Sequence, residues 1–384
     1  MNLKAPSTAR ILFAGGGTGG HLFPAVAIAD RITELWQGRD GLDIQFVGTK
    51  HGIEHRIKDS LRYPITFINI RGLQRSLSLA NLALPFIVAG ALVSTWRLFS
   101  RFMPDIVVGT GGYVSWPVVR IAIARGVPAV LQEQNSYPGI VTRQLASHAK
   151  QIFLGFDGAR KYLPKSAHTT WTGNPVRPQL TGGTRTEAHS HFILDPLKKT
   201  VLVLGGSQGA RGVNNAILAS LKQNALSQDC QLLWQTGKRD YDEMHAQAKG
   251  LMIRGSIFAF HDRMDLLYAA ADVAVARAGA STIAELTACG VPSVLIPFPQ
   301  AAADHQHKNA EECVAQGCAS LVSESSLDDI DIIRKACEMV HSGEAERMRL
   351  AIQRLNRDRR PAADVIAEDI LRLVADSHTS RETR

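Results

Sequence analysis

Residues 10–24 of the chain read RILFAGGGTGGHLFP. The apolar run that ends at Ala14 is typical of a buried strand, the glycines after it form a turn, and a helical pattern runs from Pro24 to about Leu35. A buried strand, a glycine turn and a helix make up the opening unit of a doubly wound α/β domain. This stretch therefore predicts a parallel sheet covered by helices.

The same arrangement returns in the second half of the chain. Residues 200–210 read TVLVLGGSQGA, and a helical pattern follows from Arg211 to about Leu221. The two glycine turns begin at Gly15 and Gly205, about half of the 384 residues apart. Because a single core rarely grows beyond about 250–300 residues, we expect an α/β protein with two similar Rossmann-like domains in tandem.

Short apolar runs that alternate with helical patterns predict largely parallel sheets in both halves. The expected strands are Ile44–Val47, Ile65–Ile68, Ile106–Val108, Ala129–Leu131, Gln151–Leu154, Gln231–Gln235, Ile257–Phe260, Val273–Ala276 and Ser293–Ile296. A zone rich in Pro, Gly, Ser and Thr indicates a linker between the halves. We expect domains at 1–165 and 197–360, a linker at 166–196 and a final helix within 361–384.

Charge is distributed unevenly along the chain. The net charge is +8, but residues 1–180 contain 20 basic and 9 acidic residues, and the remainder contains 23 and 26. A basic first half suggests an anionic partner, such as nucleic acid, a phosphate ligand or a membrane surface. The five cysteines form no C-x-x-C pair, which favours a reducing cytosol over a disulfide framework or a zinc site.

The segment from Ser76 to Trp96 carries no charge over 21 residues. It is long enough to span a bilayer, but Asn81, Pro85 and the lack of a second such segment argue against a transmembrane helix. Two interpretations remain. The segment is either a buried helix of a large domain, or an element at a membrane surface where the flanking arginines meet anionic headgroups. The flanking arginines are Arg71, Arg75, Arg97 and Arg101.

The first glycine turn matches the pattern G-x-G-x-x-G, but neither common nucleotide motif is complete. The second predicted strand ends without the acidic residue that binds a ribose in dinucleotide sites, and His21 stands where a P-loop has lysine. What remains is a set of N–H groups at a helix start, suited to hydroxyls or phosphate. The alternative is that the glycines only allow close packing of strand and helix.

His21 is the candidate general base. A helix start disfavours imidazolium, so a neutral ring that accepts a proton is expected there. Two further loops, containing Gly111, Gly112 and Tyr113 and then Glu133, should lie beside it at the carboxyl edge of the sheet. Glu133 is the competing base. Together the loops predict a pocket for a bulky, oxygen-rich group.

In the second half, Gly205–Gly209 offers a second phosphate cradle, and the stretch RAGASTIAE ends at Glu285. Two interpretations of Glu285 remain open. It either completes a capping box with Thr282, or it binds a pair of vicinal ribose hydroxyls while the helix start binds a diphosphate. His305 and His307 lack a third ligand, and both Asp-x-Asp pairs lie in polar stretches, so no metal site or cofactor is predicted.

Six motifs occur in the order seen in the MurG family of peptidoglycan N-acetylglucosaminyltransferases, which the chain resembles from about residue 10 to 375. They are GGTGGHLFP at 16–24, GGY at 111–113, EQN at 133–135, GNPVR at 173–177, GGSQGA at 205–210 and RAGASTIAE at 277–285. The resemblance implies the GT-B architecture, with two Rossmann-like domains facing across a cleft and the last helix crossing back to the first domain. The first domain would face the acceptor and the membrane, and the second would bind the nucleotide sugar.

The resemblance also implies a role for each motif residue. Ser207 and Gln208 would face the diphosphate of UDP-N-acetylglucosamine, His261 would contact uracil through its backbone, and Glu285 would bind the ribose. Ala280, Ser281 and Thr282 would line the nucleotide, and Gln306 would hold the donor sugar. The site would be closed from the first domain and the linker by Thr18, Gly19, Gly20, Asn135 and Arg177.

The implied reaction is the inverting transfer of N-acetylglucosamine to the 4-hydroxyl of an undecaprenyl-diphosphate-linked muramoyl-pentapeptide, without a metal or other cofactor. The protein would be peripheral, on the anionic cytoplasmic face of the bacterial inner membrane, and would bind no nucleic acid. A related transferase with another lipid acceptor is the nearest alternative. A nicotinamide-dependent dehydrogenase and a non-catalytic nucleotide-binding scaffold are the rivals from other classes.

Overall fold

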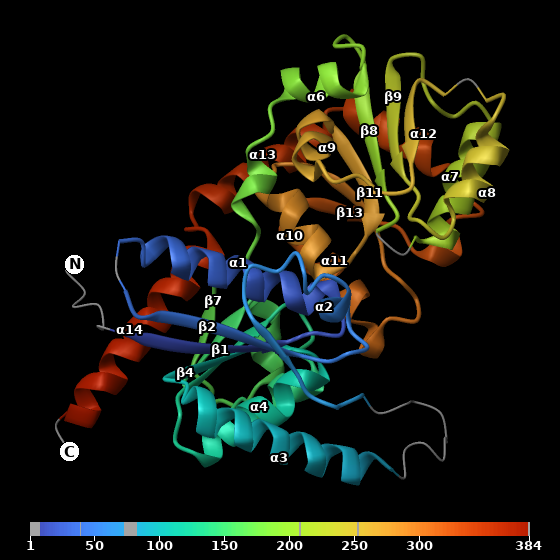
Figure 1. Cartoon of the computed structure of the whole chain (residues 1–384). Coiled ribbons are helices and arrows are strands. Elements are labelled where there is room, and N and C mark those ends of the chain that lie inside the picture. Colours follow the sequence, from blue (N-terminus) through green and yellow to red (C-terminus); the bar gives the residue numbers. More distant parts are fainter. Residues whose placement is uncertain (1–7, 39, 73–82, 207–208, 252, 383–384) are drawn as a thin grey trace. The chain divides into compact units, whose positions relative to one another are not determined.

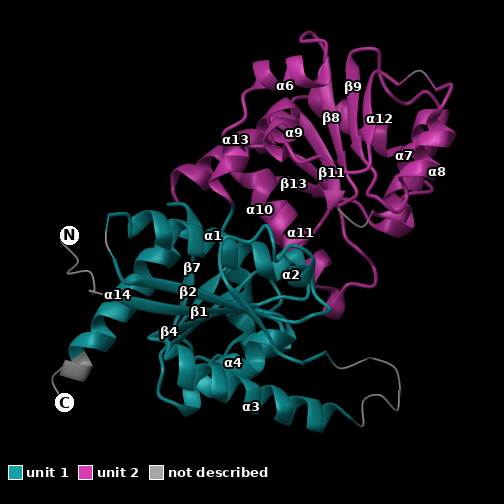
Figure 2. Cartoon of the chain, viewed as in Figure 1, with its two compact units in different colours: residues 1–176, 360–384 teal, residues 177–359 magenta. Residues whose placement is uncertain are grey.

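The computed structural model describes residues 8–38, 40–72, 83–206, 209–251 and 253–382. The chain forms two compact units, residues 1–176 with 360–384 (unit 1) and residues 177–359 (unit 2), which Figure 2 shows in different colours. Each unit contains one parallel sheet covered by helices (Figure 1). The predicted fold class, α/β with two Rossmann-like domains, is confirmed.

Unit 1 has a seven-stranded parallel sheet in the order β3-β2-β1-β4-β5-β6-β7. Phe13 of β1 pairs with Phe46 of β2 on one side and with Val108 of β4 on the other. Strand order therefore reverses between β1 and β4, the switch point of the sheet. The strands are β1 (Ala9–Gly15), β2 (Leu42–Gly48), β3 (Ile65–Phe67), β4 (Ile106–Gly111), β5 (Ala129–Glu133), β6 (Gln151–Leu154) and β7 (Thr169–Trp171).

Helices cover both faces of this sheet because its central strands are apolar on both sides. Leu12 and Ala14 point into a core with α3 and α4, while Ile11 and Phe13 point into a core with α1 and α14. The helices are α1 (Gly19–Leu35), α2 (Ile53–Arg56), α3 (Leu84–Phe102), α4 (Gly112–Ala124), α5 (Ile140–Leu145) and α14 (Ala362–Glu382), with a 3-10 turn η2 (Asp157–Tyr162).

The last helix belongs to the core of unit 1. Ile366, Ile370 and Val374 of α14 are fully buried in the cluster that contains α1. An ion pair of 2.7 Å between Nε of Arg31 and Oδ1 of Asp364 joins the two helices at their edge. The ends of the chain sequence therefore meet in one core, with α14 packed along α1.

Unit 2 repeats the plan with six parallel strands in the order β10-β9-β8-β11-β12-β13. The strands are β8 (Lys199–Leu204), β9 (Cys230–Gln235), β10 (Gly255–Phe258), β11 (Val273–Arg277), β12 (Ser293–Ile296) and β13 (Ala319–Leu321). The helices are α6 (Arg185–Phe192), α7 (Arg211–Lys222), α8 (Tyr241–Ala248), α9 (Met264–Ala270), α10 (Ala280–Ala288), α11 (His305–Ala315), α12 (Ile332–His341) and α13 (Glu344–Arg357). Short 3-10 turns are η3 (Pro178–Thr181), η4 (Ala302–Asp304) and η5 (Glu324–Ser326).

Every strand expected from the sequence is present within a few residues of its predicted limits. Two strands were not predicted, β7 and β13, which are three-residue strands at one edge of each sheet. The segment 166–196, expected as a linker, contains β7, η3 and α6.

The uncharged segment is only partly visible, since residues 76–82 lie outside the described residues. From Leu84 onward it forms α3, of which Ala91, Thr95 and Phe99 are buried along one stripe. Phe86, Val93 and Trp96 are 81%, 51% and 48% exposed. The interpretation as a buried helix is therefore wrong for the described part. No helix among the described residues is both long and apolar enough to cross a bilayer.

The packing of α14 gives a test of the unit 1 core. Ile370→Ala should lower the free energy of unfolding of unit 1 by about 2–5 kcal/mol, because it leaves a cavity against α1. Arg372→Ala, on the exposed side of the same helix, should cost less than about 1 kcal/mol because the Arg372 side chain is 57% exposed. Urea unfolding followed by circular dichroism measures both; equal losses would show that α14 is not a core helix.

Candidate active site

Three loops of unit 1 gather at the carboxyl edge of the sheet, after the neighbouring strands β1, β4 and β5. Ligands of open α/β sheets bind at this edge, near the switch point. Most of the predicted site residues of the first half lie at the ends of these strands, on the loops or in the helical turns that follow. They are Thr18, Gly19, Gly20, His21, Gly111, Gly112, Tyr113, Glu133 and Asn135.

His21, the third residue of α1, is held by its Nδ1 atom. This nitrogen lies 3.1 Å from the carbonyl oxygen of Thr110 and 2.9 Å from Oε1 of Gln134. A carbonyl oxygen can only accept a hydrogen bond, so Nδ1 carries the proton of the neutral ring. The lone pair then lies on Nε2, for which no protein partner is found among the described residues. The ring is therefore oriented to accept a proton at Nε2.

Three side-chain amides, linked by hydrogen bonds, hold Gln134 in its orientation toward His21. Gln134 donates from Nε2 to the Thr110 carbonyl at 2.7 Å, which turns its Oε1 toward His21. Behind it, Gln132 donates to Oδ1 of Asn174 at 2.9 Å, and Asn174 donates to the backbone oxygen of Gln134 at 2.9 Å. The sequence analysis gave no role to these amides, because only the fold brings Asn174 from the GNPVR motif beside the β5 loop.

Gly111 and Gly112 are required by backbone conformation and by close packing. Their φ values are +96° and +73°, a region that L side chains rarely adopt. A Cβ atom at Gly111 would lie 2.8 Å from Nδ1 of His21, and one at Gly112 would lie 2.5 Å from the carbonyl oxygen of Gly16. Tyr113 packs its ring over Gly17, where a Cβ atom would lie 3.4 Å from the ring. The GGY motif thus lets the β4 loop contact His21 and the first glycine loop.

Glu133 is buried and fully engaged as an acceptor. Its Oε1 accepts from the N–H of Asn135 at 3.0 Å, and its Oε2 accepts from the N–H of Gly139 and the hydroxyl of Thr142 at 2.9 and 2.6 Å. Only 3% of the residue is exposed. These contacts indicate that Glu133 shapes the loop containing Asn135.

In unit 2, buried polar groups pack against the described part of the second glycine loop. Gly206 and Gly209 have positive φ values of 69° and 85°. The buried amide of Asn214 donates to the carbonyl oxygen of Thr236 at 2.8 Å and to Asp240 at 3.0 Å, directly beneath Gly209. The predicted residues Ser207 and Gln208 lie outside the described residues.

Helix α10 follows β11, which pairs with β8. Its start therefore lies at the carboxyl edge of the unit 2 sheet. Ala280, Ser281 and Thr282 are the first three residues of this helix. The hydroxyl of Ser281 is buried and has no hydrogen-bond partner among the described residues. A buried hydroxyl without a partner is costly, and its position at a helix start suits an anionic ligand.

The capping-box interpretation of Thr282 and Glu285 is wrong. The N-cap of α10 is Gly279, so both residues lie inside the helix, past the positions that a capping box requires. Instead, Oε2 of Glu285 accepts a hydrogen bond of 2.6 Å from the hydroxyl of Tyr268 on α9. Burial raises the pKa of the Glu285 carboxyl, while the Tyr268 hydrogen bond and the charge of Arg177 oppose that rise. The structure thus brings Arg177 close to Glu285.

His261 lies on the loop after β10, and Gln306 lies in the first turn of α11. The backbone N–H of His261 donates to Oε1 of Gln235 at 3.1 Å, and its ring packs against His191 at 5.3 Å between centroids. Burial, and then the nearby His191, lower the pKa of His261. Gln306 accepts from the N–H of Phe298 at 2.9 Å and so holds the loop after β12.

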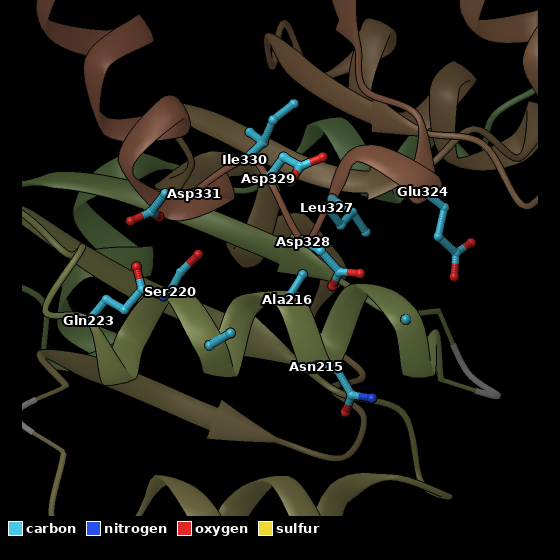
Figure 3. A pocket seen from close by; sticks show the side chains of 12 residues that line it. Asn215, Ala216, Ser220, Gln223, Glu324, Leu327, Asp328, Asp329, Ile330 and Asp331 are labelled. Atoms are coloured by element: carbon cyan, nitrogen blue, oxygen red, sulfur yellow. The ribbon is translucent and has the colours of Figure 1, made fainter.

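A separate hollow of about 550 Å³ lies in unit 2 between α7 and the segment 324–331 (Figure 3). Its wall is polar and acidic: Asp328, Asp329 and Asp331 line it, and Asp331 lies opposite Ser220 and Gln223 of α7. None of the predicted site residues lines it. Within the described ranges, no group of three His, Cys, Asp or Glu side chains is arranged to hold a metal ion.

Comparisons with known proteins place the chain in a family. The N-terminal domain of glycosyltransferase family 28 matches residues 11–154, and its C-terminal domain matches residues 200–365. Among solved structures, the MurG protein of Acinetobacter baumannii superimposes with a TM-score of 0.73 and 24% identity, over 94% of this chain and 99% of that one. The calicheamicin glycosyltransferase CalG4 superimposes with a TM-score of 0.66 and 15% identity, over 95% and 98%.

Two curated relatives are closer in sequence. A protein of Chlorobium limicola is 42% identical over 335 residues, which is 86% of this chain and 90% of the relative. A protein of Salinibacter ruber is 40% identical over 379 residues, or 97% and 98%. Both are named UDP-N-acetylglucosamine--N-acetylmuramyl-(pentapeptide) pyrophosphoryl-undecaprenol N-acetylglucosamine transferase.

The two Rossmann-like units, together with these matches, identify a glycosyltransferase of the GT-B class. More particularly, the chain belongs to glycosyltransferase family 28. The resemblance to MurG inferred from the six motifs is confirmed by these relatives.

The raised pKa of Glu285 has a testable consequence for stability. A carboxyl whose pKa is higher in the folded than in the unfolded state loses stabilisation as pH rises through the folded value. Glu285→Gln cannot ionise and still accepts from Tyr268. Its Tm should therefore exceed that of the wild type at neutral pH, and the difference should shrink as pH falls into the ordinary glutamate range.

Thermal unfolding between pH 4 and pH 8 measures this difference. Glu338→Gln, a change at an exposed residue of α12, serves as the control and should show no such trend. A Tm gain that is the same at every pH would contradict an unfavourable buried charge at Glu285.

Proposed function

We propose that the enzyme transfers N-acetylglucosamine from UDP-N-acetylglucosamine to the 4-hydroxyl of a lipid-linked N-acetylmuramoyl-pentapeptide, with inversion at the anomeric carbon. The names of relatives that are about 40% identical over nearly the whole chain support the substrates. The observation that carries the chemistry is the imidazole of His21, whose Nδ1–H donates to the Thr110 carbonyl and whose Nε2 has no partner among the described residues.

In the proposed reaction, the 4-hydroxyl oxygen of the acceptor attacks the anomeric carbon of the donor sugar. The bond from that carbon to the diphosphate breaks, and its electron pair leaves with UDP. The hydroxyl proton passes to Nε2 of His21, which becomes an imidazolium. Its Nδ1–H remains bonded to Thr110 and Gln134, and these two oxygens stabilise the developing positive charge.

The donor is proposed to bind unit 2. The start of α10 and the Ser281 hydroxyl would receive the diphosphate, beside the second glycine loop with Ser207 and Gln208. Glu285, oriented by Tyr268, would bind the ribose hydroxyls. Because the N–H of His261 is donated to Gln235, uracil would meet the carbonyl oxygen of His261. Gln306 would hold the sugar, and Arg177 would add a positive charge near Glu285.

A transfer assay tests this proposal. Radiolabelled UDP-N-acetylglucosamine and a muramoyl-pentapeptide diphosphate lipid should give a labelled, lipid-soluble disaccharide product. The alternative, a related transferase with another lipid acceptor, predicts donor binding without product from this acceptor.

UDP-N-acetylglucosamine should raise the Tm, NAD should not, and Glu285→Ala should weaken the donor effect by about one to two decades in affinity.

If His21 is the base, its substitution should change kcat but not the affinity for UDP. His21→Ala should lower kcat by about 10²–10⁴-fold, the usual contribution of a positioned base. UDP affinity should stay near that of the wild type because UDP binds the other unit. Glu133→Gln should change kcat less and raise the KM for the acceptor, since Glu133 holds the Asn135 loop. A near-normal kcat of His21→Ala in steady-state assays would remove the base assignment.

We further propose that α3 attaches the protein to the cytoplasmic face of the bacterial inner membrane. Phe86, Val93 and Trp96 form an exposed apolar stripe along this helix. Arg97 and Arg101 are exposed at its carboxyl end, and Arg125 stacks on Trp96 at 3.8 Å. An apolar stripe beside basic side chains suits the interface of an anionic bilayer.

Liposome binding tests the membrane proposal. The protein should bind vesicles with anionic lipid, and binding should weaken with salt because charges separated by more than about 8 Å are screened at physiological ionic strength. Phe86→Ser should weaken binding by up to about 1.5–3 kcal/mol of lost apolar burial. Leu197→Ser, at a residue that is 91% exposed on unit 2, is the control. Equal effects of the two changes in a sedimentation assay would rule out α3 as the attachment site.

A further inference from the structure

Glu54 is a buried carboxylate that the proposed reaction does not use. It lies on α2, after β2, and is fully inaccessible to solvent. Its Oε2 accepts a hydrogen bond of 2.9 Å from the N–H of Gly17, and its Oε1 accepts one of 2.8 Å from the N–H of Thr49. The hydroxyl of Thr49 adds a longer contact of 3.4 Å. The carboxylate therefore joins the glycine loop after β1 to the end of β2.

The chain leaves space for this carboxylate at three glycines. A Cβ atom at Gly16 would lie 2.5 Å from Oε1 of Glu54, and one at Gly48 would lie 2.5 Å from its Cγ. A Cβ atom at Gly52 would collide with both oxygens. Three of the glycines around this edge of the sheet thus surround one side chain, and Gly17 adds a backbone donor to it.

The charge of Glu54 is stabilised by backbone groups. Among the described residues no lysine or arginine forms an ion pair with it, so the N–H groups of Gly17 and Thr49 are its main partners. Burying a carboxylate is costly unless it is hydrogen-bonded in this way. The bond to Gly17 also removes one N–H group from those that the first glycine loop could offer to a phosphate.

We propose that Glu54 is a positioning residue for His21, an inference that rests on the proposed function. Gly17 has a φ of +87° and is followed by Thr18, the N-cap of α1, so the orientation of its peptide sets where the helix begins. His21 sits in the first turn of that helix. Glu54 holds the Gly17 peptide, and through it the direction of the His21 ring toward the acceptor hydroxyl.

Glu54→Gln is the sharpest variant because it keeps the shape and removes the charge. An amide has one acceptor oxygen, so its NH₂ group would face either the Gly17 or the Thr49 N–H, and one of the two bonds is lost. A misplacement of about 1 Å costs up to about 100-fold in rate. We expect kcat to fall by about 10- to 100-fold, with the KM for UDP-N-acetylglucosamine and the affinity for UDP within about 2-fold of the wild type.

Asp105→Asn is the matched control. Asp105 is 1% exposed and accepts a hydrogen bond of 2.9 Å from the N–H of Arg10, at the amino edge of the same sheet. It is therefore a buried carboxylate that holds a backbone N–H away from the site. Asp105→Asn should lower the Tm but leave kcat within about 2-fold. If both variants lower kcat in proportion to their loss of Tm, Glu54 is only a structural residue and the inference fails.

If Glu54→Gln folds poorly, a second variant and a second measurement still test the inference. Gly48→Ala keeps the carboxylate and displaces it, and it should also lower kcat without changing UDP affinity. Hydrogen exchange of the peptide containing Gly17 should accelerate in either variant and stay unchanged in Asp105→Asn. Unchanged exchange, or a wild-type kcat, overturns the inference. A wild-type enzyme that transfers no sugar would instead overturn the proposed function, while the exchange result would still decide whether Glu54 holds the loop.

Discussion

The pair of hydrogen bonds between His21 and Thr110 joins the two halves of the unit 1 sheet at the point where strand order reverses. The carbonyl oxygen of Thr110 accepts from Nδ1 of His21, and the hydroxyl of Thr110 donates to the carbonyl oxygen of His21 at 2.8 Å. Because the second bond uses the backbone of α1, the ring and the helix are fixed together. Gly111 and Gly112 follow Thr110 because a side chain there would collide with the ring or the first glycine loop. The direction of Nε2, and with it the chemistry proposed for unit 1, depends on this contact.

The two units share a fold but use the edges of their sheets differently. In unit 1, the glycine loop after β1 already holds a carboxylate, Glu54, at the N–H of Gly17. In unit 2, the start of α10 contains the Ser281 hydroxyl, which has no protein partner among the described residues. In the proposed function, the first arrangement positions a base and the second receives an anion. The start of α10 follows β11 and not the repeated glycine turn after β8, so the two units would use different loops of the shared fold for these tasks.

Local patterns predicted the fold well because strands and glycine turns are decided by nearby residues. The repeat at Gly15 and Gly205, and the placement of His21 at a helix start, needed only the spacing of apolar and glycine residues. The same method failed where the fold brings distant residues together. The amide chain from Gln134 to Asn174, the bond from Tyr268 to Glu285 and the burial of Glu54 have no local signal. The pattern Thr282-x-x-Glu285 was misleading for the opposite reason. It matches the sequence pattern of a capping box, but α10 already begins after Gly279, so both residues lie past the helix start that a capping box would complete.

Helix α14 forms part of the core that supports α1. The buried face of α1, the helix that carries His21, packs against Ile366, Ile370 and Val374 of α14. During synthesis these residues emerge only after all of unit 2, so the core under α1 cannot be complete before unit 2 has been made. Contacts between residues this far apart in sequence carry a high entropic cost before they form. The first turn of α1 is oriented by the bonds of His21 to Thr110 and Gln134 and by the bond of the preceding Gly17 to Glu54, while the position of the whole helix also depends on α14.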